Sequence, residues 1–396
     1  MPRKTTEVTI SPAVLKWARE TAGYSHENVA WRLNVTQENV ETWETASPAR
    51  LTLRQLEELA RFYRRPTAAL LLREAPTEPP LPQDFRRPLH RNVPFSPELR
   101  FAVRRAYRLQ RLIREMMEAL GQPYASDIPR ANSQEDSETV ARVLRESFGI
   151  SIRQQLGWKT SGEAFRQWRD ALESRRIPVF QADFPRRESQ GFSVSDAHPY
   201  AIVVTSQDPF TARCFTLFHE FAHLLLREGG ICLTEEAPSS DGDSLAKTEY
   251  WCHRFAEAFL VDADTLRDRR ETGIILRRES GYEQALRRLA SSFEVSQHVV
   301  LFRLWHLGLM SEARFWMEYG RVRQEAAAEA AQRQAKKKES KGGPSPAAHV
   351  VQERGRFFTR LVLEALEREM LSYAEAIGYL GVRLKHLDEL RQTAYG

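Results

Sequence analysis

Two histidines and a glutamate, spaced for one face of a helix, are the residues of this sequence best suited to chemistry. His219, Glu220 and His223 stand in the run His-Glu-Phe-Ala-His. Side chains at positions i and i+4 of an α-helix face the same way, so both imidazoles can bind one metal ion. A carboxylate next to the first ligand can act as general base toward an attacking water. The spacing predicts a metal-dependent hydrolase, with His219 and His223 as ligands and Glu220 as catalytic base.

A catalytic zinc ion generally has a third protein ligand and one open position. We favour Glu249, on the next expected helix, because it completes a His-His-Glu set. Asp241 and Asp243 in the preceding loop, and His253 one turn beyond Glu249, compete for this role. His253 could instead stand beside the metal as a second catalytic residue and stabilise the tetrahedral oxyanion. Zn2+ is the expected cofactor, although His and Glu ligands also accept Mn, Fe or Co.

The cysteines Cys214, Cys232 and Cys252 form no CxxC pair, and their number is odd. This usage argues against a disulfide framework and indicates a reducing compartment. Cys232 lies in the loop between the expected ligands, where a regulatory thiolate could occupy the open zinc position and hold the enzyme off. The simpler interpretation is a loop cysteine without metal contact. We expect Cys214 and Cys252, on helices, to be small core residues.

Two helices must position these ligands, and we expect them over 211–226 and about 244–261. Three apolar residues after His223 indicate that the histidine face of the first helix is turned inward. Strands followed by helices are typical of an α+β domain. Upstream, the pattern predicts helices near 136–148 and 161–175, then β-strands near 178–182, 191–194 and 200–205.

Residues 10–75 have the pattern of several short helices with polar caps. Ser25, followed by Asn28, is expected to cap the second helix, Thr36 the third, and Thr52 to begin a fourth. Two short helices joined by a tight turn and packed by flanking helices form a helix-turn-helix.

The third of these helices offers both suitable and unsuitable side chains for DNA. Gln37, Asn39 and Thr42 suit base edges, whereas Glu38 and Glu41 would repel phosphates if exposed. The module therefore suits either duplex DNA or a docking and autoregulatory role toward protein.

Prolines crowd the segment from 74 to 97, which marks an extended linker. An amphipathic helix is expected next, over about 97–120. Arginines interleaved with aromatic rings suit single-stranded nucleic acid. The alternative is a solvated face opposite an apolar face that packs on the rest of the protein. The arginines on this face are Arg100, Arg104, Arg108 and Arg111, and the apolar face comprises Leu99, Ala102, Ala106, Leu109, Ile113, Met116 and Leu120.

Several motifs, in order over roughly 140–318, resemble the ImmA/IrrE family of metallopeptidases. They are GFSVSDAHPYAIVV, ARCFTLFHEFAHLLL, GGIC, EYWCHRFAEAFLVD and LASSFEVSQHVVLFRLWHLGLM. The resemblance implies that His219, His223 and Glu249 are zinc ligands and that Glu220 is the base. The run ARETAGYSHENVAWRLNVTQENVETWE resembles the lambda-repressor-like (Xre) helix-turn-helix.

Two positions depart from the ImmA/IrrE pattern. His253 stands where the family more often has Asn, and Asp262 stands where Pro is usual. Neither change removes a ligand, but His253 could alter the local hydrogen bonding.

The expected fold class is mostly α, with an all-α helix-turn-helix domain, a small α+β zincin-like metallopeptidase domain and a helical C-terminal appendage. A length of 396 residues, 42% hydrophobic and 28% charged, suits two or three soluble domains. We place a helix-turn-helix domain at 1–75, a linker with the Arg-rich helix at 76–134, the peptidase domain at 135–318, a charged linker at 319–348 and a helical segment at 349–396. The absence of a long apolar run or secretion segment predicts a cytoplasmic protein.

By the resemblance, such fusions are similar to regulators that cleave a repressor or antitoxin under DNA damage, stress or phage attack, some of them stimulated by single-stranded DNA. We therefore expect a zinc-dependent regulatory endopeptidase in which Glu220 passes a proton from water to the leaving amine. The alternatives are a DNA-binding transcription regulator whose peptidase-like domain is a sensor or scaffold, and a toxin–antitoxin component that mainly binds a partner. Expected partners are a protein substrate and DNA, as duplex or single strand, but no membrane; a homodimer is left open.

Overall fold

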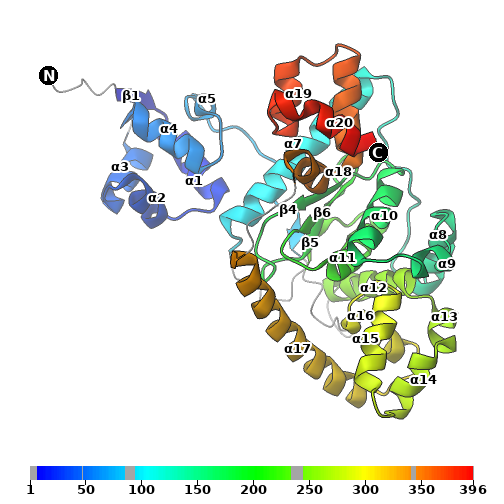
Figure 1. Ribbon diagram of the computed structural model, residues 1–396. Helices are drawn as coiled ribbons and strands as arrows, with labels where there is room; N and C mark the ends of the chain where they lie inside the picture. The colour runs from blue at the N-terminus through cyan, green and yellow to red at the C-terminus, as the bar shows by residue number, and fades with distance from the viewer. Residues whose placement is uncertain (1–6, 47, 85–93, 233–243, 340–344, 396) are drawn as a thin grey trace. The chain divides into compact units, whose positions relative to one another are not determined.

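The computed structural model describes residues 7–46, 48–84, 94–232, 244–339 and 345–395, without the side chains of 329–339. The chain forms two units (Figure 1). The N-terminal unit comprises residues 1–81 and 88–105, and the second unit comprises 82–87 and 106–396.

Short helices build the N-terminal unit, as the sequence predicts. All three expected caps form, because the side chains of Ser25, Thr36 and Thr52 each accept a hydrogen bond from the backbone N–H three residues on. The elements are β1 (Glu7–Ile10), α1 (Pro12–Ala22), α2 (His26–Leu33), α3 (Gln37–Thr45), β2 (Ala49–Thr52), α4 (Leu53–Phe62) and α5 (Thr67–Leu70).

A two-stranded antiparallel ladder of β1 and β2 also joins this unit, where only helices were expected. Ile10 lies opposite Ala49, and Val8 opposite Leu51. Three of these side chains, Ile10, Ala49 and Leu51, are buried in the same core as the helices. The ladder thus pairs the strand before α1 with the strand after α3.

The long amphipathic helix expected after the linker is α7 (Pro97–Ala119). Its predicted apolar face is confirmed, since every one of the seven side chains named for it is buried. The division between the two units falls within this helix, after Arg105.

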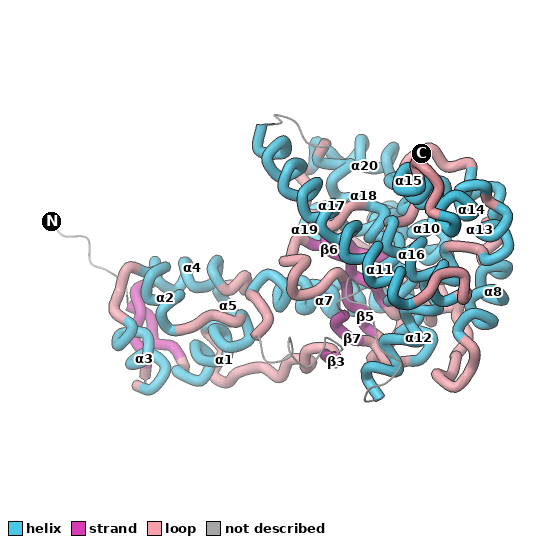
Figure 2. Tube along the Cα trace, turned by 90° about the horizontal axis from the view of Figure 1, so that it is seen from below, coloured by secondary structure: helices cyan, strands magenta, loops and turns pink. Residues whose placement is uncertain are grey.

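A five-stranded mixed sheet organises the second unit, in the order β3-β7-β5-β6-β4. Figure 2 labels four of these strands, β3, β7, β5 and β6. β5 runs antiparallel to both β6 and β7, whereas β4 is parallel to β6 and β3 is parallel to β7. The three predicted strands are confirmed as β4 (Val179–Ala182), β5 (Gly191–Val194) and β6 (Ala201–Thr205). The sequence analysis missed β7 (Gly230–Cys232) in the expected loop and β3 (Gln83–Asp84) in the expected linker.

The helices around the sheet include the two expected to carry the metal ligands. α11 packs against β5, β6, α10 and α12, which places it between the sheet and the outer helices (Figures 1 and 2). Stacked rings of Phe218 on α11 and Phe259 on α12, with centroids 4.1 Å apart, fix the contact between these two helices. The helices are α8 (Ser137–Ser147), α9 (Ile152–Leu156), α10 (Ser161–Glu173), α11 (Phe210–Leu226), α12 (Ser244–Leu260), α13 (Ala263–Asp268), α14 (Arg270–Arg277), α15 (Tyr282–Ser292), α16 (Gln297–His306) and α17 (Glu312–Glu339).

The C-terminal segment is helical, as expected, but it consists of several helices rather than one. α18 (Pro346–Glu367) packs against β4 and α10, so it covers an edge strand of the sheet. The guanidinium of Arg169 on α10 donates to the carbonyls of Val351 and Gln352 on α18. The segment therefore belongs to the second unit. It continues with α19 (Tyr373–Leu380), a short 3-10 helix (Leu384–His386) and α20 (Leu387–Tyr395).

None of the helices in the described ranges is long and apolar enough to cross a membrane.

Candidate metal centre

The chemically suited side chains lie on the two helices at the centre of the second unit. α11 carries His219, Glu220 and His223, and α12 carries Glu249. His219 has 1% of its surface exposed and His223 has none, so the histidine face of α11 is turned inward, as expected. No Pro or Gly interrupts either helix.

The potential ligand atoms converge on one point. The Nε2 atoms of His219 and His223 are 3.3 Å apart. The Glu249 carboxylate bridges them, with Oε2 lying 3.2 Å from His219 Nε2 and Oε1 lying 3.0 Å from His223 Nε2. In a tetrahedral site with metal–ligand distances of about 2.0–2.1 Å, neighbouring ligand atoms are about 3.3 Å apart. These side chains therefore fit a small tetrahedral metal ion.

The two carboxylates of this buried centre have pKa shifts in opposite directions. Although burial opposes its charge, contacts with His219 and His223 hold the pKa of Glu249 far below its ordinary value. Burial raises the pKa of Glu220, although Ser193 and the two histidines favour its charged form. A carboxylate with a raised pKa is suited to receive a proton from a molecule bound beside it.

A glycine lets β5 run close to α11. A Cβ at Gly191 would lie 2.5 Å from Thr216 Cγ2 and 3.3 Å from Glu220 Cγ. Only a residue without a side chain allows the strand to approach α11 this closely. Gly191 thus holds the sheet against the side of the site where Glu220 lies.

The structure places His253 near the metal site but outside the group of converging ligand atoms. Its ring is buried between Phe215 and Phe302, at centroid distances of 4.8 and 4.3 Å. Burial lowers the pKa of His253 well below its ordinary value, which favours a neutral imidazole. Its ring centroid is 6.4 Å from that of His219, so the oxyanion role stays a prediction. The other competing ligands, Asp241 and Asp243, lie outside the described residues.

All three cysteines are buried and free of disulfides. Cys232 ends β7, and its Sγ is 3.2 Å from His223 Nε2. It therefore joins His219, His223 and Glu249 in a group whose ligand atoms all lie within 4.8 Å of one another. The interpretation of Cys232 as a loop cysteine is wrong, because Cys232 ends the short strand β7, whereas its contact with a metal stays a prediction. Cys214 and Cys252 are core residues, as expected, and the Cys252 side chain also forms a hydrogen bond with His223.

A buried ion network behind α12 was not found from the sequence. Glu257 Oε1 lies 2.5 Å from His306 Nδ1 and 3.2 Å from Arg254 Nε. Glu138 on α8 in turn accepts two hydrogen bonds from Arg303, at 2.6 and 3.0 Å. Arg254 and Glu257 share α12, but Glu138 lies on α8 and both Arg303 and His306 lie on α16, so local spacing does not reveal the whole network. The network joins α12 to α8 and α16.

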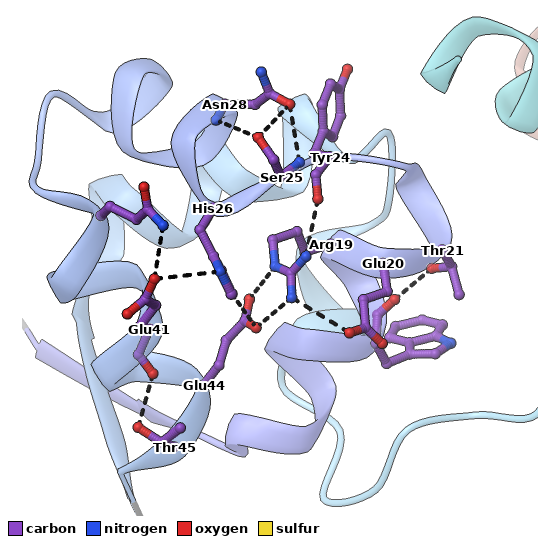
Figure 3. Close-up of polar contacts among 12 residues, drawn as sticks. Arg19, Glu20, Thr21, Tyr24, Ser25, His26, Asn28, Glu41, Glu44 and Thr45 are labelled. Carbon is purple, nitrogen blue, oxygen red and sulfur yellow. Dashed lines mark hydrogen bonds and ion pairs between the residues drawn. The ribbon is translucent and has the colours of Figure 1, made fainter. Parts of the chain in front are cut away.

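In the helix-turn-helix, a second ion cluster joins three helices (Figure 3). Glu44 on α3 accepts two hydrogen bonds from Arg19 on α1, at 2.7 and 2.8 Å, and its Oε2 is 3.0 Å from His26 Nε2 on α2. Burial opposes the charge of Glu44, but Arg19 and His26 outweigh it and lower its pKa. Glu44 therefore stabilises the packing of the unit.

The side chains expected to contact bases are exposed on α3, but each one is engaged within its own helix. Gln37 donates to Glu41 at 2.8 Å, and the Thr42 hydroxyl donates to the Glu38 carbonyl at 2.7 Å. The Asn39 side chain completes the cap of α3 by accepting from the Thr36 hydroxyl at 2.9 Å. α3 carries no Lys or Arg, so base contact by these residues stays a prediction.

The four arginines of α7 divide into two pairs. Arg100 donates to the Phe95 carbonyl at 3.2 Å, and Arg104 donates to the Tyr63 carbonyl at 2.7 Å. Burial lowers the pKa of Arg104 to about 10. Arg108 and Arg111 are exposed. Only the second pair is therefore free of the packing of the N-terminal unit, and nucleic-acid binding by all four stays a prediction.

Comparison with known families gives the same division of the chain. Residues 172–305 match the IrrE N-terminal-like domain of the M78 peptidases, and residues 13–72 match a helix-turn-helix domain. No curated protein matches the chain. The match at 172–305 includes α11, β7 and α12, and therefore the whole group of converging ligands.

The fold and the site thus define a metallopeptidase-type domain joined to a helix-turn-helix module. More particularly, the chain is a fusion of an ImmA/IrrE-type peptidase domain with an N-terminal helix-turn-helix domain, as the resemblance implied.

Proposed function

We propose that this chain is a zinc-dependent regulatory endopeptidase. The observation that carries the proposal is the convergence of His219, His223 and Glu249 at tetrahedral spacing beside the buried carboxylate of Glu220. The match to an M78 peptidase domain supports a metal cofactor. Two imidazoles and one carboxylate are a typical ligand set of catalytic zinc in peptidases.

The side chains divide the work of hydrolysis. His219, His223 and Glu249 would hold the zinc, which supplies Lewis acidity toward water and the scissile carbonyl. Glu220 lies one residue from a ligand and receives the proton of the attacking water on a carboxylate oxygen. It then delivers this proton to the leaving amine. His253, if it contacts the substrate, would contribute a hydrogen bond to the oxyanion.

The proposed substrate is a repressor-like or antitoxin-like protein, cleaved in a stress, DNA-damage or phage-defence response. The fusion to a helix-turn-helix domain supports a regulatory role, because such domains act at DNA. Nucleic acid is the proposed control signal, through the helix-turn-helix or through the exposed Arg108 and Arg111.

Metal content tests the proposed site directly. We expect about one zinc per chain in the wild type and in Glu220→Gln, and less zinc in Glu249→Ala, because Glu249 is a ligand and Glu220 is not. Lys247→Ala, an exposed change on the same helix, is the control and should keep its zinc. Elemental analysis of protein purified without added metal gives the answer. Full zinc in Glu249→Ala would contradict the ligand set.

Cleavage is measured by labelling new protein N-termini in cells that express the wild type or Glu220→Gln. Removing the general base should lower the cleavage rate by about 10²–10⁴-fold while zinc stays bound. Adding single-stranded DNA to the purified enzyme and its substrate tests the control signal, and Arg108→Ala should weaken any response. Identical new N-termini in both cell lines would instead favour a regulator whose peptidase-like domain is a scaffold.

A further inference from the structure

Cys232 lies at the metal site in a way that the proposed three-ligand mechanism does not use. Its side chain is fully buried, and its Sγ is 3.2 Å from His223 Nε2. It is the fourth member of the group formed with His219, His223 and Glu249. A catalytic zinc site with three protein ligands keeps one position open, whereas a site with four protein ligands is closed.

The sheet fixes the position of this sulfur. Cys232 pairs with Gly191 in the antiparallel β5–β7 ladder. Its carbonyl accepts hydrogen bonds from the Gln190 N–H at 3.3 Å and from the Ser189 hydroxyl at 3.0 Å. Ser189 is itself buried, and its hydroxyl also donates to the Gly191 carbonyl at 2.6 Å. The thiol is thus held by backbone pairing to the same strand that packs against Glu220.

The chemistry of the four side chains matches a closed zinc site. Zinc binds thiolates at about 2.3 Å and imidazoles at about 2.0–2.1 Å, which separates neighbouring S and N ligand atoms by about 3.5 Å in a tetrahedron. The 3.2 Å between Cys232 Sγ and His223 Nε2 is close to this spacing. A thiol that coordinates zinc is deprotonated by the metal.

We propose that Cys232 is the fourth ligand of the bound metal and keeps the peptidase latent. The proposal rests on the proposed function, because it needs a metal held by His219, His223 and Glu249. While the sulfur is bound, no position is open for the attacking water, and Glu220 has no proton to receive. Activation requires that the metal–sulfur bond break and that water take the vacated position. Displacement of β7, which carries the sulfur, would achieve this.

Cys252 is the natural alternative as fourth ligand, because its side chain also forms a hydrogen bond with His223. It lies on α12, three residues after Glu249, and it is not part of the group of four converging ligand atoms. Cys214 is fully buried in the core. Single substitutions of these two cysteines therefore provide matched controls.

The spectrum of cobalt-substituted protein tests the proposal without an activity assay. Co2+ takes the same ligands, and a bound thiolate adds an intense sulfur-to-metal charge-transfer band in the near ultraviolet. We expect this band in the wild type, in Cys214→Ser and in Cys252→Ala, and its loss in Cys232→Ser and Cys232→Ala. The weaker visible bands of tetrahedral Co2+ should persist in both Cys232 variants, which shows that they are folded and loaded.

The outcomes separate the inference from the proposed function. A wild-type spectrum with visible Co2+ bands but no sulfur band would overturn the fourth ligand and leave the three-ligand site standing. A sulfur band that disappears in Cys252→Ala and persists in Cys232→Ser would also overturn it. Failure of the wild type to bind Co2+ at all would overturn both proposals. If the inference holds, Cys232→Ser should also show a higher peptidase activity than the wild type.

Discussion

Burial shifts the pKa values of ionisable side chains around the sheet. Asp208, outside the candidate metal site, shows what it costs to bury a carboxylate. Asp208 precedes α11, and only 2% of its surface is exposed. Arg186 lies 3.3 Å from its Oδ1, yet neither carboxylate oxygen has a hydrogen-bond partner among the described residues. Desolvation exceeds the attraction of Arg186 and Arg213, so burial raises the pKa of Asp208 from 3.8 to about 6.

This raised pKa predicts that Asp208→Asn stabilises the protein at high pH. The folded state binds the proton more tightly than the unfolded state, so stability is lost as the pH rises from about 4 through about 6. A shift of about two units corresponds to at most about 3 kcal/mol. The free energy of unfolding of Asp208→Asn should therefore exceed that of the wild type at pH 8 and not at pH 4.

Urea unfolding at the two pH values measures this difference. Asp183→Asn, at an exposed aspartate nearby, is the control and should show no gain that depends on pH. Equal effects of Asp208→Asn at both pH values would show that desolvation and attraction to the arginines cancel, so that the pKa of this carboxylate is not raised.

At single residues, sequence spacing was informative where partners share a helix. His219, Glu220 and His223 are such a set, and the structure brings them together on one face of α11. Asn39 was expected to face DNA, but a side chain at the third position of a helix can also complete its cap, as it does here. The pair of Glu257 and His306 could not be predicted, because its members are 49 residues apart and belong to different helices.

Short strands mark the limit of prediction for whole elements. β3 has two residues and β7 has three, which is too short for an alternating pattern to appear. The helices α7, α11 and α12 were predictable because their apolar residues recur over many turns. β7 matters most for the candidate site, because it brings Cys232 to His219, His223 and Glu249.

Among the helices, α18 depends on one glycine for its contact with α10. Gly355 adopts φ 82° and ψ 162° and divides α18 at a kink. The close approach lets the Phe357 N–H donate to Glu173 Oε2 at 2.8 Å, while Arg169 Nε donates to Glu173 Oε1 at 3.1 Å. A Cβ at position 355 would overlap Glu173 Oε1 and lie 2.9 Å from Arg169 Nη2.

We expect Gly355→Ala to destabilise the protein by at least about 1–3 kcal/mol, because it combines a strained backbone with a clash against a buried ion pair. Gly378→Ala is the matched control, since Gly378 lies within α19 and a Cβ there meets no atom within 4 Å. This control should be neutral or stabilising by about 0.5–1 kcal/mol. Thermal unfolding of both variants decides the matter, and equal melting temperatures would refute the role of the kink.

At the scale of the whole molecule, the sequence suggested a separable C-terminal appendage, whereas the contacts of α18 make it part of the second unit. The rings of Phe180 on β4 and Phe358 on α18 lie edge to face at 6.4 Å. Leu361 and Val362 of the same helix are also buried. The expected boundary at 349 falls inside α18. The sequence shows a change from a charged linker to an apolar helix there, but it does not show which part of the protein that helix packs against.

Two truncations test this organisation of the chain. Deletion of 346–396 would expose an edge strand of the sheet and leave Arg169 buried without the carbonyls of Val351 and Gln352, so we expect aggregation or loss of zinc binding. Deletion of 1–81 leaves β3, the whole of α7 and every converging ligand in place, so residues 82–396 should keep a cooperative unfolding transition and about one zinc per chain. Elemental analysis and circular dichroism of both fragments measure the difference. A soluble, zinc-loaded fragment 1–345 would mean that the sheet and the metal site are stable without the C-terminal helices, and that these helices are an appendage after all.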